Sequence, residues 1–296
     1  MKQVTIAALV ACAGCHFSVD ALTNLGSTDA DMAVGDDLAT ADPGDLAGGV
    51  VRDLAQPTGP VDMTPDPCSG APALGSGNIA AQCVIGTPPT IDGNLADWPL
   101  ASFLPMTKTS AAQANGTWDV TGIPNDANSS ARYFVRWDLQ YLYVAVSITD
   151  NIQNSPNTSD SQISNNDAIE LFFDGLHERS SSYDSNDWQL VFDTTMAKVA
   201  GQGTTVVTFP TTVVEAWGGT SPSWTLEAAI PWSILAVNSA QPGRLVGFDL
   251  KLDDNDLGTM RDRDLVLFYN PGNGNGGCNA PFCRADAFGT VQLQGR

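Results

Sequence analysis

Hydrophobic and polar residues alternate with a period of two along much of the chain after residue 130, as in β-strands with one buried face. Residues 131–138 and 141–149 each place a stripe of large side chains on one face: Tyr133, Val135 and Trp137 in the first, and Leu142, Val144, Val146 and Ile148 in the second. Because the link over residues 138–140 is short, we expect these two strands to pair as a hairpin.

The stretch NNDAIELFFDG, residues 165–175, predicts another strand, which ends in an Asp-Gly turn. Ile169, Leu171 and Phe173 fall on one face, whereas Glu170 lies at the centre of the other. A carboxylate at this position has two interpretations. It is either a solvent-exposed strand residue or a ligand-binding group on the open face of a sheet.

Further strands are predicted at regular spacing. They cover residues 187–193, with Trp188, Leu190 and Phe192 inward and Gln189 and Val191 outward, and residues 204–209, 224–230, 245–252, 265–269 and 289–293. One short helix is expected over residues 231–235, which begin with proline. Many alternating strands with so little helix predict an all-β fold, an antiparallel β-sandwich. Seven Trp and eleven Phe residues supply an ample core for one such domain.

The first part of the chain has a different texture. Asp-Leu-Ala or Asp-Met-Ala recurs at six- to nine-residue spacing among Pro, Gly and Thr, which fits neither a helix nor a strand. A segment of this composition cannot bury enough apolar area to offset its ordering entropy, so residues 16–82 are expected to be a disordered acidic linker. The sandwich domain is expected over residues 83–296.

Residues 1–15, MKQVTIAALVACAGC, have the layout of an export signal: one Lys, a short apolar run and small residues before cysteine. LVAC, ending at Cys12, resembles a bacterial lipobox, and AGC, ending at Cys15, is a second candidate. The resemblance implies lipidation of one of these cysteines and a lipid-anchored protein of the bacterial cell envelope, at the outer membrane or cell surface. The alternative is an ordinary secretory signal and a secreted protein.

Four cysteines remain in the exported part, an even number that suggests disulfide bonds. Pairing of nearest neighbours gives Cys68–Cys83 and Cys278–Cys283, and two other connectivities are open. A zinc site is not expected, because the cysteine spacings are not those of a zinc ribbon and the chain has two His residues.

Charge narrows the range of partners. The formal net charge is −20, with 33 acidic residues against 13 basic ones, so no basic stripe is present that could neutralise the phosphates of nucleic acid or anionic lipid. No run approaches the roughly 18 apolar residues of a membrane-spanning helix. Contact with a membrane is therefore expected only through the N-terminal lipid. The acidity is compatible with neutral ligands and with calcium.

Oxygen ligands for calcium are dense in DDNDLG, residues 253–258. Asp253, Asp254 and Asp256 are the candidate ligands, and a solvated turn is the alternative. Acidic residues at neighbouring strand ends could add ligands: Asp150, Asp167, Asp174 and Asp187.

A series of short motifs resembles carbohydrate-binding module family 9 and its wider sandwich superfamily. They occur in order as PTIDG and DW (89–98), VRWD (135–138), YLYVAV (141–146), NDAIELFFD (166–174), LEAAIPW (226–232), VGFDL (246–250) and AFGTV (287–291). The order holds over roughly residues 84–294. The resemblance implies the sandwich fold and sugar binding by aromatic platforms and polar groups on a sheet face. It also implies structural calcium, which the family often carries.

The family's binding residues carry over in part. Its acidic sugar contact falls on Glu170, its Asn contact on Asn279 and one aromatic platform on Phe282. Three family positions are occupied by other residue types, because the first platform Trp aligns with Ser164, an Arg with Val191 and a Gln with Lys251. Gln189 lies beside Glu170 on the expected outer face. The missing platform has two candidate replacements in polar, Gly-containing segments, Trp118 and Trp217, for which packing against the core is the alternative.

The sequence therefore predicts non-catalytic binding of a polysaccharide or another hydroxyl-rich glycan by an exported, monomeric β-sandwich protein. An enzyme is not expected, because no pair of catalytic carboxylates stands out, and His16 and His177 provide no triad. One alternative is a protein-interaction or envelope-structural module without a small ligand. Another is a haem-binding sandwich, for which His177, Met106, Met260 and Lys251 are the available axial ligands.

Overall fold

A computed structural model describes residues 66, 68–69, 79–111, 123–195, 197–268 and 284–295. Several residues singled out by the sequence lie outside this part: Cys12, Cys15, Trp118, Cys278, Asn279, Phe282 and Cys283. No helix in the described part is long and apolar enough to cross a membrane. The described residues belong to one compact unit that begins at Val61.

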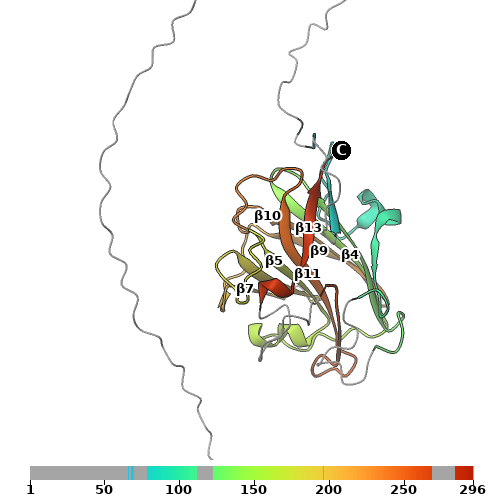
Figure 1. Ribbon diagram of the computed structural model, residues 1–296. Helices are drawn as coiled ribbons and strands as arrows, with labels where there is room; N and C mark the ends of the chain where they lie inside the picture. Colours follow the sequence, from blue (N-terminus) through green and yellow to red (C-terminus); the bar gives the residue numbers. More distant parts are fainter. Residues whose placement is uncertain are drawn as a thin grey trace, which may run out of the picture. The chain divides into compact units, whose positions relative to one another are not determined.

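The described part is almost entirely β-structure, as the alternating pattern predicts (Figure 1). Its strands are β1 (Ile79–Cys83), β2 (Leu104–Met106), β3 (Ser129–Trp137), β4 (Tyr141–Asp150), β5 (Ala168–Asp174), β6 (Asp187–Asp193), β7 (Lys198–Gln202), β8 (Thr205–Val207), β9 (Val214–Thr220), β10 (Ser223–Pro231), β11 (Leu245–Asp254), β12 (Arg263–Val266) and β13 (Gly289–Gln294). Short 3₁₀ turns are η1 (Leu95–Asp97), η2 (Leu100–Ser102), η3 (Asp160–Asn165) and η6 (Ala285–Ala287).

The strands form one curled sheet in the order β8-β7-β6-β5-β11-β13-β1-β3-β4-β10-β9, with β12 beside β11 and β2 beside β3. We call β5 to β8 with β11 to β13 the β5 half, and β2 to β4 with β9 and β10 the β4 half. β1 joins the halves and runs parallel to both neighbours, β13 and β3. The expected all-antiparallel arrangement is therefore wrong at this strand, which begins inside the segment predicted to be a linker.

The inner faces of the two halves pack into one hydrophobic core, as in a sandwich. The predicted stripes are confirmed: the inward residues of β3, β4, β5 and β6 are all buried in this cluster, for example Val135, Val144, Leu171 and Leu190. β3 and β4 pair as the predicted hairpin, with Val135 opposite Val144. Cys68 and Cys83 lie at the edge of the core and form a disulfide with a Cα–Cα distance of 5.7 Å. This pair confirms one of the nearest-neighbour pairings.

The helix expected over residues 231–235 is wrong. Pro231 ends β10, and the residues after it form a single turn that closes with a hydrogen bond of 3.0 Å from the Val237 amide to the Trp232 carbonyl. Ala236 adopts a left-handed conformation (φ +56°), which ends the turn before a helix can propagate. Trp232 and Leu235 are nevertheless buried. The apolar residues of this segment therefore pack in the core, but in a turn and not in a helix.

Candidate functional site

The outer face of the β5 half carries the polar residue that the sequence singled out. Cross-strand register places Glu170 of β5 opposite Lys251 of β11 on one side and Val191 of β6 on the other. Because Ile169 and Leu171 point into the core, the side chains of this row point outward. The sequence was therefore right about the face on which Glu170 lies.

The expectation of an exposed carboxylate at Glu170 is wrong, since only 1% of the residue is accessible. Lys251 Nζ lies 2.8 Å from one carboxylate oxygen of Glu170, and Arg261 Nη1 lies 3.5 Å from the same atom. The amide nitrogen of Gln189 donates a hydrogen bond to the other oxygen. Burial by itself would raise the pKa of Glu170, but the charges of Lys251 and Arg261 outweigh it and lower the pKa to about 2.

Two more carboxylates share these cations. Asp253 lies 2.7 Å from Lys251 and 2.6 Å from Arg261, and Asp264 lies 3.6 Å and 3.7 Å from the same two side chains. The resulting network contains three carboxylates and two cations, and nearly all of it is buried. Asp253, a candidate calcium ligand from the sequence, therefore contacts cationic side chains in this structure. Arg261 and Asp264 gave no recognisable signal in the sequence.

A cavity of about 150 Å³ opens beside this network. It is lined by Ser164, which lies in η3, and by residues of β6, β7 and β8: Gln189, Val191, Val199, Ala200, Gly201 and Val206. Ile163 of η3 packs on Ala168 and Val191 and thereby fixes Ser164 at the cavity wall. Glu170 is joined to this cavity through Gln189.

A second acidic cluster lies where β4 and β11 end. Oxygen atoms of Asp150, Asp254 and Asp256 all lie within 4.8 Å of one another. Both oxygens of Asp254 and one oxygen each of Asp150 and Asp256 are buried without a hydrogen-bond partner. Burial, together with repulsion from neighbouring carboxylates, raises the pKa of Asp150 and of Asp254 to about 8. Two of the three predicted calcium ligands are thus brought together, with Asp150 in place of Asp253.

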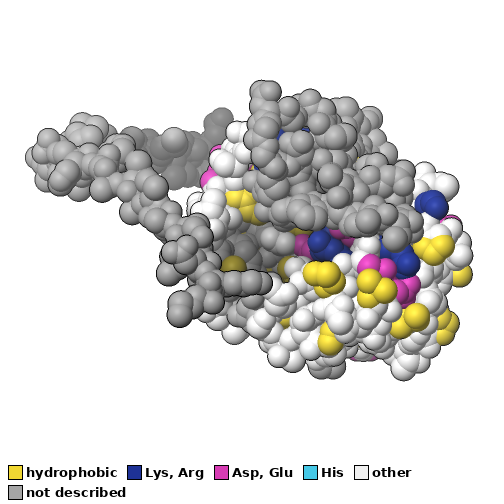
Figure 2. Space-filling model, turned by 90° about the horizontal axis from the view of Figure 1, so that it is seen from below, with side chains coloured by type: hydrophobic (Ala, Val, Ile, Leu, Met, Phe, Trp, Pro, Cys, Tyr) yellow, Lys and Arg dark blue, Asp and Glu magenta, His cyan; other side chains and the backbone are white. Residues whose placement is uncertain are grey.

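Arg263 is the cation nearest to this acidic cluster. Its guanidinium pairs with Asp256 and lies 3.6 Å from Asp254. One cation cannot neutralise three carboxylates, and hard divalent cations such as calcium prefer oxygen ligands of this type. Asp167 lies next to the cluster, with its carboxylate accepting the amides of Asn154 and Asn255. Seen from below, charged side chains of both signs gather beside exposed hydrophobic ones (Figure 2).

Another buried carboxylate lies on the other half of the sheet. Glu227 of β10 accepts hydrogen bonds from the indole of Trp98 (2.5 Å) and from the amides of Gly93 (2.6 Å) and Asp92 (3.1 Å). Gly93 has φ +81°, and a Cβ there would lie 2.4 Å from the Trp217 carbonyl oxygen, so only glycine fits. The IDG and DW motifs are therefore joined to the LEAAIPW motif through one carboxylate.

These motifs coincide with a known family. A family model described as "Carbohydrate family 9 binding domain-like" matches residues 91–296. The chain belongs to this family. Family 9 domains are non-catalytic carbohydrate-binding modules, in agreement with the function predicted from the sequence.

Family 9 relatives are found among xylan- and glucan-degrading enzymes. The chain is 30% identical to exoglucanase XynX of Acetivibrio thermocellus over 217 residues and 28% identical to endo-1,4-beta-xylanase A of Thermotoga maritima over 129 residues. These matches cover 73% and 44% of this chain but 17% and 11% of the relatives. The chain thus spans less than a fifth of the length of these multidomain enzymes.

Solved family 9 structures share the fold. One is a module from Caldicellulosiruptor kristjanssonii in complex with cellotriose, with a TM-score of 0.55 and 20% identity, covering 74% of this chain and 94% of that one. A putative carbohydrate-binding protein from Bacteroides uniformis has a TM-score of 0.50 and 13% identity, with coverage of 73% and 98%. At these identities the similarity confirms the β-sandwich.

The family 9 positions of the binding site converge only in part. Glu170, Lys251, Ser164 and Val191 lie on or beside the outer face of the β5 half. Trp217, a candidate for the missing platform, instead lies on β9 and packs against the main core. No aromatic side chain in the described part of the chain is exposed, and Trp118, Asn279 and Phe282 lie outside that part.

The four residues proposed as haem ligands lie in different environments. Met106 is buried in the main core, Met260 is exposed, and Lys251 is ion-paired with Glu170. The His177 ring lies 2.9 Å from the Thr290 hydroxyl.

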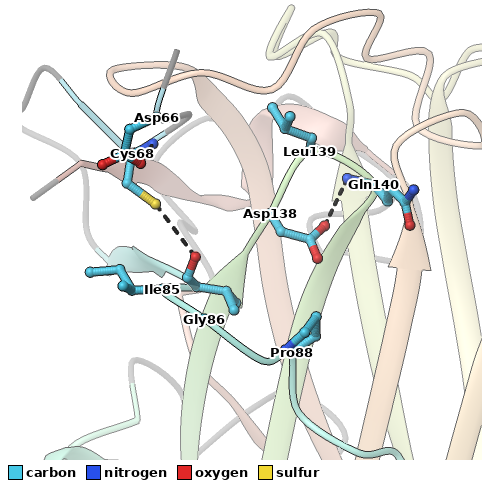
Figure 3. Close-up of a pocket in the computed structure, with 9 residues that line it drawn as sticks. Asp66, Cys68, Ile85, Gly86, Pro88, Asp138, Leu139 and Gln140 are labelled. Atoms are coloured by element: carbon cyan, nitrogen blue, oxygen red, sulfur yellow. Dashed lines mark hydrogen bonds between the residues drawn. The ribbon is translucent and has the colours of Figure 1, made fainter. Parts of the chain in front are cut away.

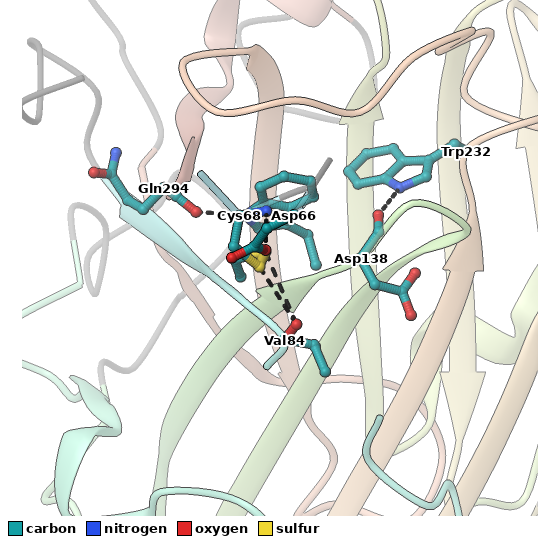
Figure 4. The surroundings of a disulfide bond; sticks show 8 residues. Asp66, Cys68, Val84, Asp138, Trp232 and Gln294 are labelled. Atoms are coloured by element: carbon teal, nitrogen blue, oxygen red, sulfur yellow. Dashed lines mark hydrogen bonds between the residues drawn. A yellow bond between two sulfur atoms is a disulfide. The ribbon is translucent and has the colours of Figure 1, made fainter. Parts of the chain in front are cut away.

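A larger cavity, of about 370 Å³, lies beside the Cys68–Cys83 disulfide (Figures 3 and 4). Its walls are Asp66 and Cys68, residues 84–88, and the turn between β3 and β4. The Asp138 carboxylate is already occupied, since it accepts the amides of Gln140 and Tyr141 and the hydroxyl of Tyr143. Exposed Ile85 and Leu139 make this cavity mainly apolar, unlike the face around Glu170.

Proposed function

We propose that the domain binds its carbohydrate on the outer face of the β5 half, next to Glu170, Gln189 and Lys251. The observation that carries this proposal is a buried, ion-paired polar network at the position of the family's acidic sugar contact. A network held this firmly keeps its polar groups in place before a ligand arrives, which lowers the ordering cost of binding. Related structures hold cellotriose and glucose.

Two measurements on the full chain test this location. A glycan array followed by calorimetry with cellotriose and glucose is expected to show saturable binding. Hydrogen–deuterium exchange with and without the bound sugar is then expected to show added protection in β5 and β6 and none in the turn between β3 and β4. Protection confined to that turn, or no binding to any glycan of the array, would rule out the proposed site.

A matched surface control is available at the larger cavity. Leu139 is 60% exposed there, so Leu139→Ser removes apolar surface from that cavity without disturbing the core. The variant is expected to bind the sugar as the wild type does. A clear loss of affinity in Leu139→Ser would place the ligand at the disulfide end instead.

We also propose that a structural calcium ion binds at Asp150, Asp254 and Asp256. The buried carboxylate oxygens without partners favour this, because leaving such oxygens unpaired is costly and a divalent cation would satisfy them. Calcium is expected to raise the melting temperature of the wild-type protein relative to EDTA and to have little effect on Asp254→Asn. Equal melting temperatures of the wild type in calcium and in EDTA would contradict a calcium site.

We further propose that the protein is exported and lipid-anchored through Cys12 or Cys15. The signal-like N-terminal sequence supports this, and the Cys68–Cys83 disulfide is of the kind that forms in oxidising compartments. Changing both N-terminal cysteines to Ser is expected to move the protein from the detergent phase to the soluble fraction. Retention of the double variant in membranes would exclude a lipid anchor at these positions.

A further inference from the structure

Gln189 is the polar side chain that connects the buried network to the 150 Å³ cavity. A carboxylate only accepts hydrogen bonds, so Gln189 must turn its NH₂ group, and not its carbonyl, toward Glu170. The carbonyl oxygen Oε1 then points away from Glu170. A Cβ placed on Gly201, another lining residue, would lie 3.8 Å from this oxygen, so Oε1 lies at the cavity wall.

Two acceptors at this cavity have no hydrogen-bond partner among the described residues. Neither Oε1 of Gln189 nor the hydroxyl of Ser164 makes a hydrogen bond to any residue in the described part of the chain. The remaining walls are aliphatic: Val191, Val199, Ala200 and Val206. A sugar ring has the complementary surface, since its C–H face is apolar and its edge carries hydroxyl groups that donate and accept hydrogen bonds.

Charge at the cavity selects among sugars. None of its lining residues is charged. The nearby cations, Lys251 and Arg261, are already matched by the carboxylates of Glu170, Asp253 and Asp264. In the described part of the chain no unpaired cation lies there to bind a carboxylate of the ligand. The volume, about half the lower limit of a drug-sized pocket, suits one sugar unit rather than a chain.

From these observations we infer that this cavity takes one neutral sugar unit of the bound glycan, and that Gln189 and Ser164 are its polar contacts. Glu170 acts as a positioning residue that orients Gln189, and it does not touch the sugar itself. This inference rests on the proposed function and goes further in naming the contacts and the ligand's charge class.

Two substitutions test the inference from different directions. Gln189→Met keeps the length of the side chain and removes both its acceptor and its donor to Glu170. Gly201→Val fills the cavity without touching the Gln189–Glu170 hydrogen bond, and its Cβ has room. Each is expected to weaken binding of glucose and cellotriose at least tenfold in calorimetry. Gly201→Val should retain the wild-type melting temperature, so its loss of binding cannot come from unfolding.

The matched control is Gln202→Met. Gln202 also lies on β7 and also donates its amide, to the Ser185 carbonyl at 2.7 Å, but it does not line the cavity. This variant is expected to bind glucose as the wild type does. On the wild type, glucose is expected to bind at least tenfold more tightly than glucuronate, which differs by a carboxylate.

The possible outcomes distinguish failure of the proposed function from failure of this inference. Wild-type protein that binds no glycan on the array overturns both the proposed function and this inference. Wild-type binding that Gln189→Met and Gly201→Val leave unchanged overturns the inference alone. Equal or tighter binding of glucuronate overturns the assignment of a neutral ligand.

Discussion

Glu170 and Glu227 occupy equivalent places on the two halves of the sheet. Each lies near the middle of a strand, points to the outer face and is almost completely buried. Their partners differ in kind, because Glu170 meets Lys251 and Arg261, whereas Glu227 meets the N–H groups of Trp98, Gly93 and Asp92. The same fold therefore stabilises a buried carboxylate in two ways, by ion pairs and by N–H donors.

The two solutions have different consequences. A carboxylate paired with cations stays ionised, and each cation depends on it in turn, so the loss of one member leaves an uncompensated charge. A carboxylate held by N–H donors instead fastens a piece of chain, here residues 92–98, across the outside of the β4 half. The first arrangement keeps polar groups oriented beside a cavity, and the second covers the sheet.

The largest expected effect is the loss of Lys251. Lys251→Met removes the cation shared by Glu170 and Asp253, both of which are buried, and is expected to lower the free energy of unfolding by about 3–5 kcal/mol. Lys198→Met is the matched control, because the Lys198–Glu215 pair is partly exposed and should be worth less than about 1 kcal/mol. Urea denaturation of both variants measures the difference. Similar losses would mean that burial of the network contributes little.

The pH dependence of stability distinguishes the two glutamates, because folding shifts their pKa values in opposite directions. The pKa of Glu170 falls from 4.5 to about 2 on folding, so this residue stabilises the fold above pH 4.5 and loses that contribution as the pH falls toward 2. Burial raises the pKa of Glu227 despite its N–H donors, so its contribution is largest at low pH and declines as the pH rises through the raised pKa.

The measurement is the difference in unfolding free energy between the wild type and each Glu→Gln variant, from pH 3 to pH 7. For Glu170→Gln the difference is expected to grow with pH, by about 2 kcal/mol between pH 3 and pH 5. For Glu227→Gln it is expected to shrink. Two differences that change in the same direction would show that the two carboxylates are not distinguished by their partners.

The smallest expected effect is at Trp98. Trp98→Phe keeps an aromatic ring beside Phe103 and Phe134 and removes one hydrogen bond to Glu227, while the two backbone amides remain. The expected loss of stability is about 1–3 kcal/mol, the range for a hydrogen bond to a charged group. Thermal melting measures it. A loss as large as that of Lys251→Met would mean that Trp98 carries the segment by packing and that the carboxylate adds little.

The alternation of hydrophobic and polar residues predicted most of the strands, but it did not predict which groups pack on their outer face. It placed Ile169, Leu171 and Phe173 in the core and Glu170 on the other face, which is where they lie. It could not show that this face is covered, because a period of two distinguishes the faces of a strand and not what packs on them. The partner of Glu170 is 81 residues away, and only the register of β5 with β11 brings it there.

The acidic cluster shows the same limit. Asp253, Asp254 and Asp256 are close in sequence, but Asp253 points from the outer face to Lys251, while Asp254 and Asp256 meet Asp150 from β4. β9 was missed because its glycines and polar residues carry no strand pattern. That strand is held by its pairing with β10, which local sequence does not encode.

The disulfide at the end of β1 also determines how the domain bears a mechanical load. A pull on the chain before residue 68 passes through the disulfide into Cys83, so the loop of residues 69–82 and the pairing of Ile79, Ala80 and Ala81 with β13 carry no tension. The force enters where Cys83 pairs with Trp137 of β3 and where the Val84 amide bonds to the Trp137 carbonyl. If the bridge were reduced, the same pull would enter at Ile79, the first residue of β1. It would then load the pairing of β1 with β13 from that end of the strand.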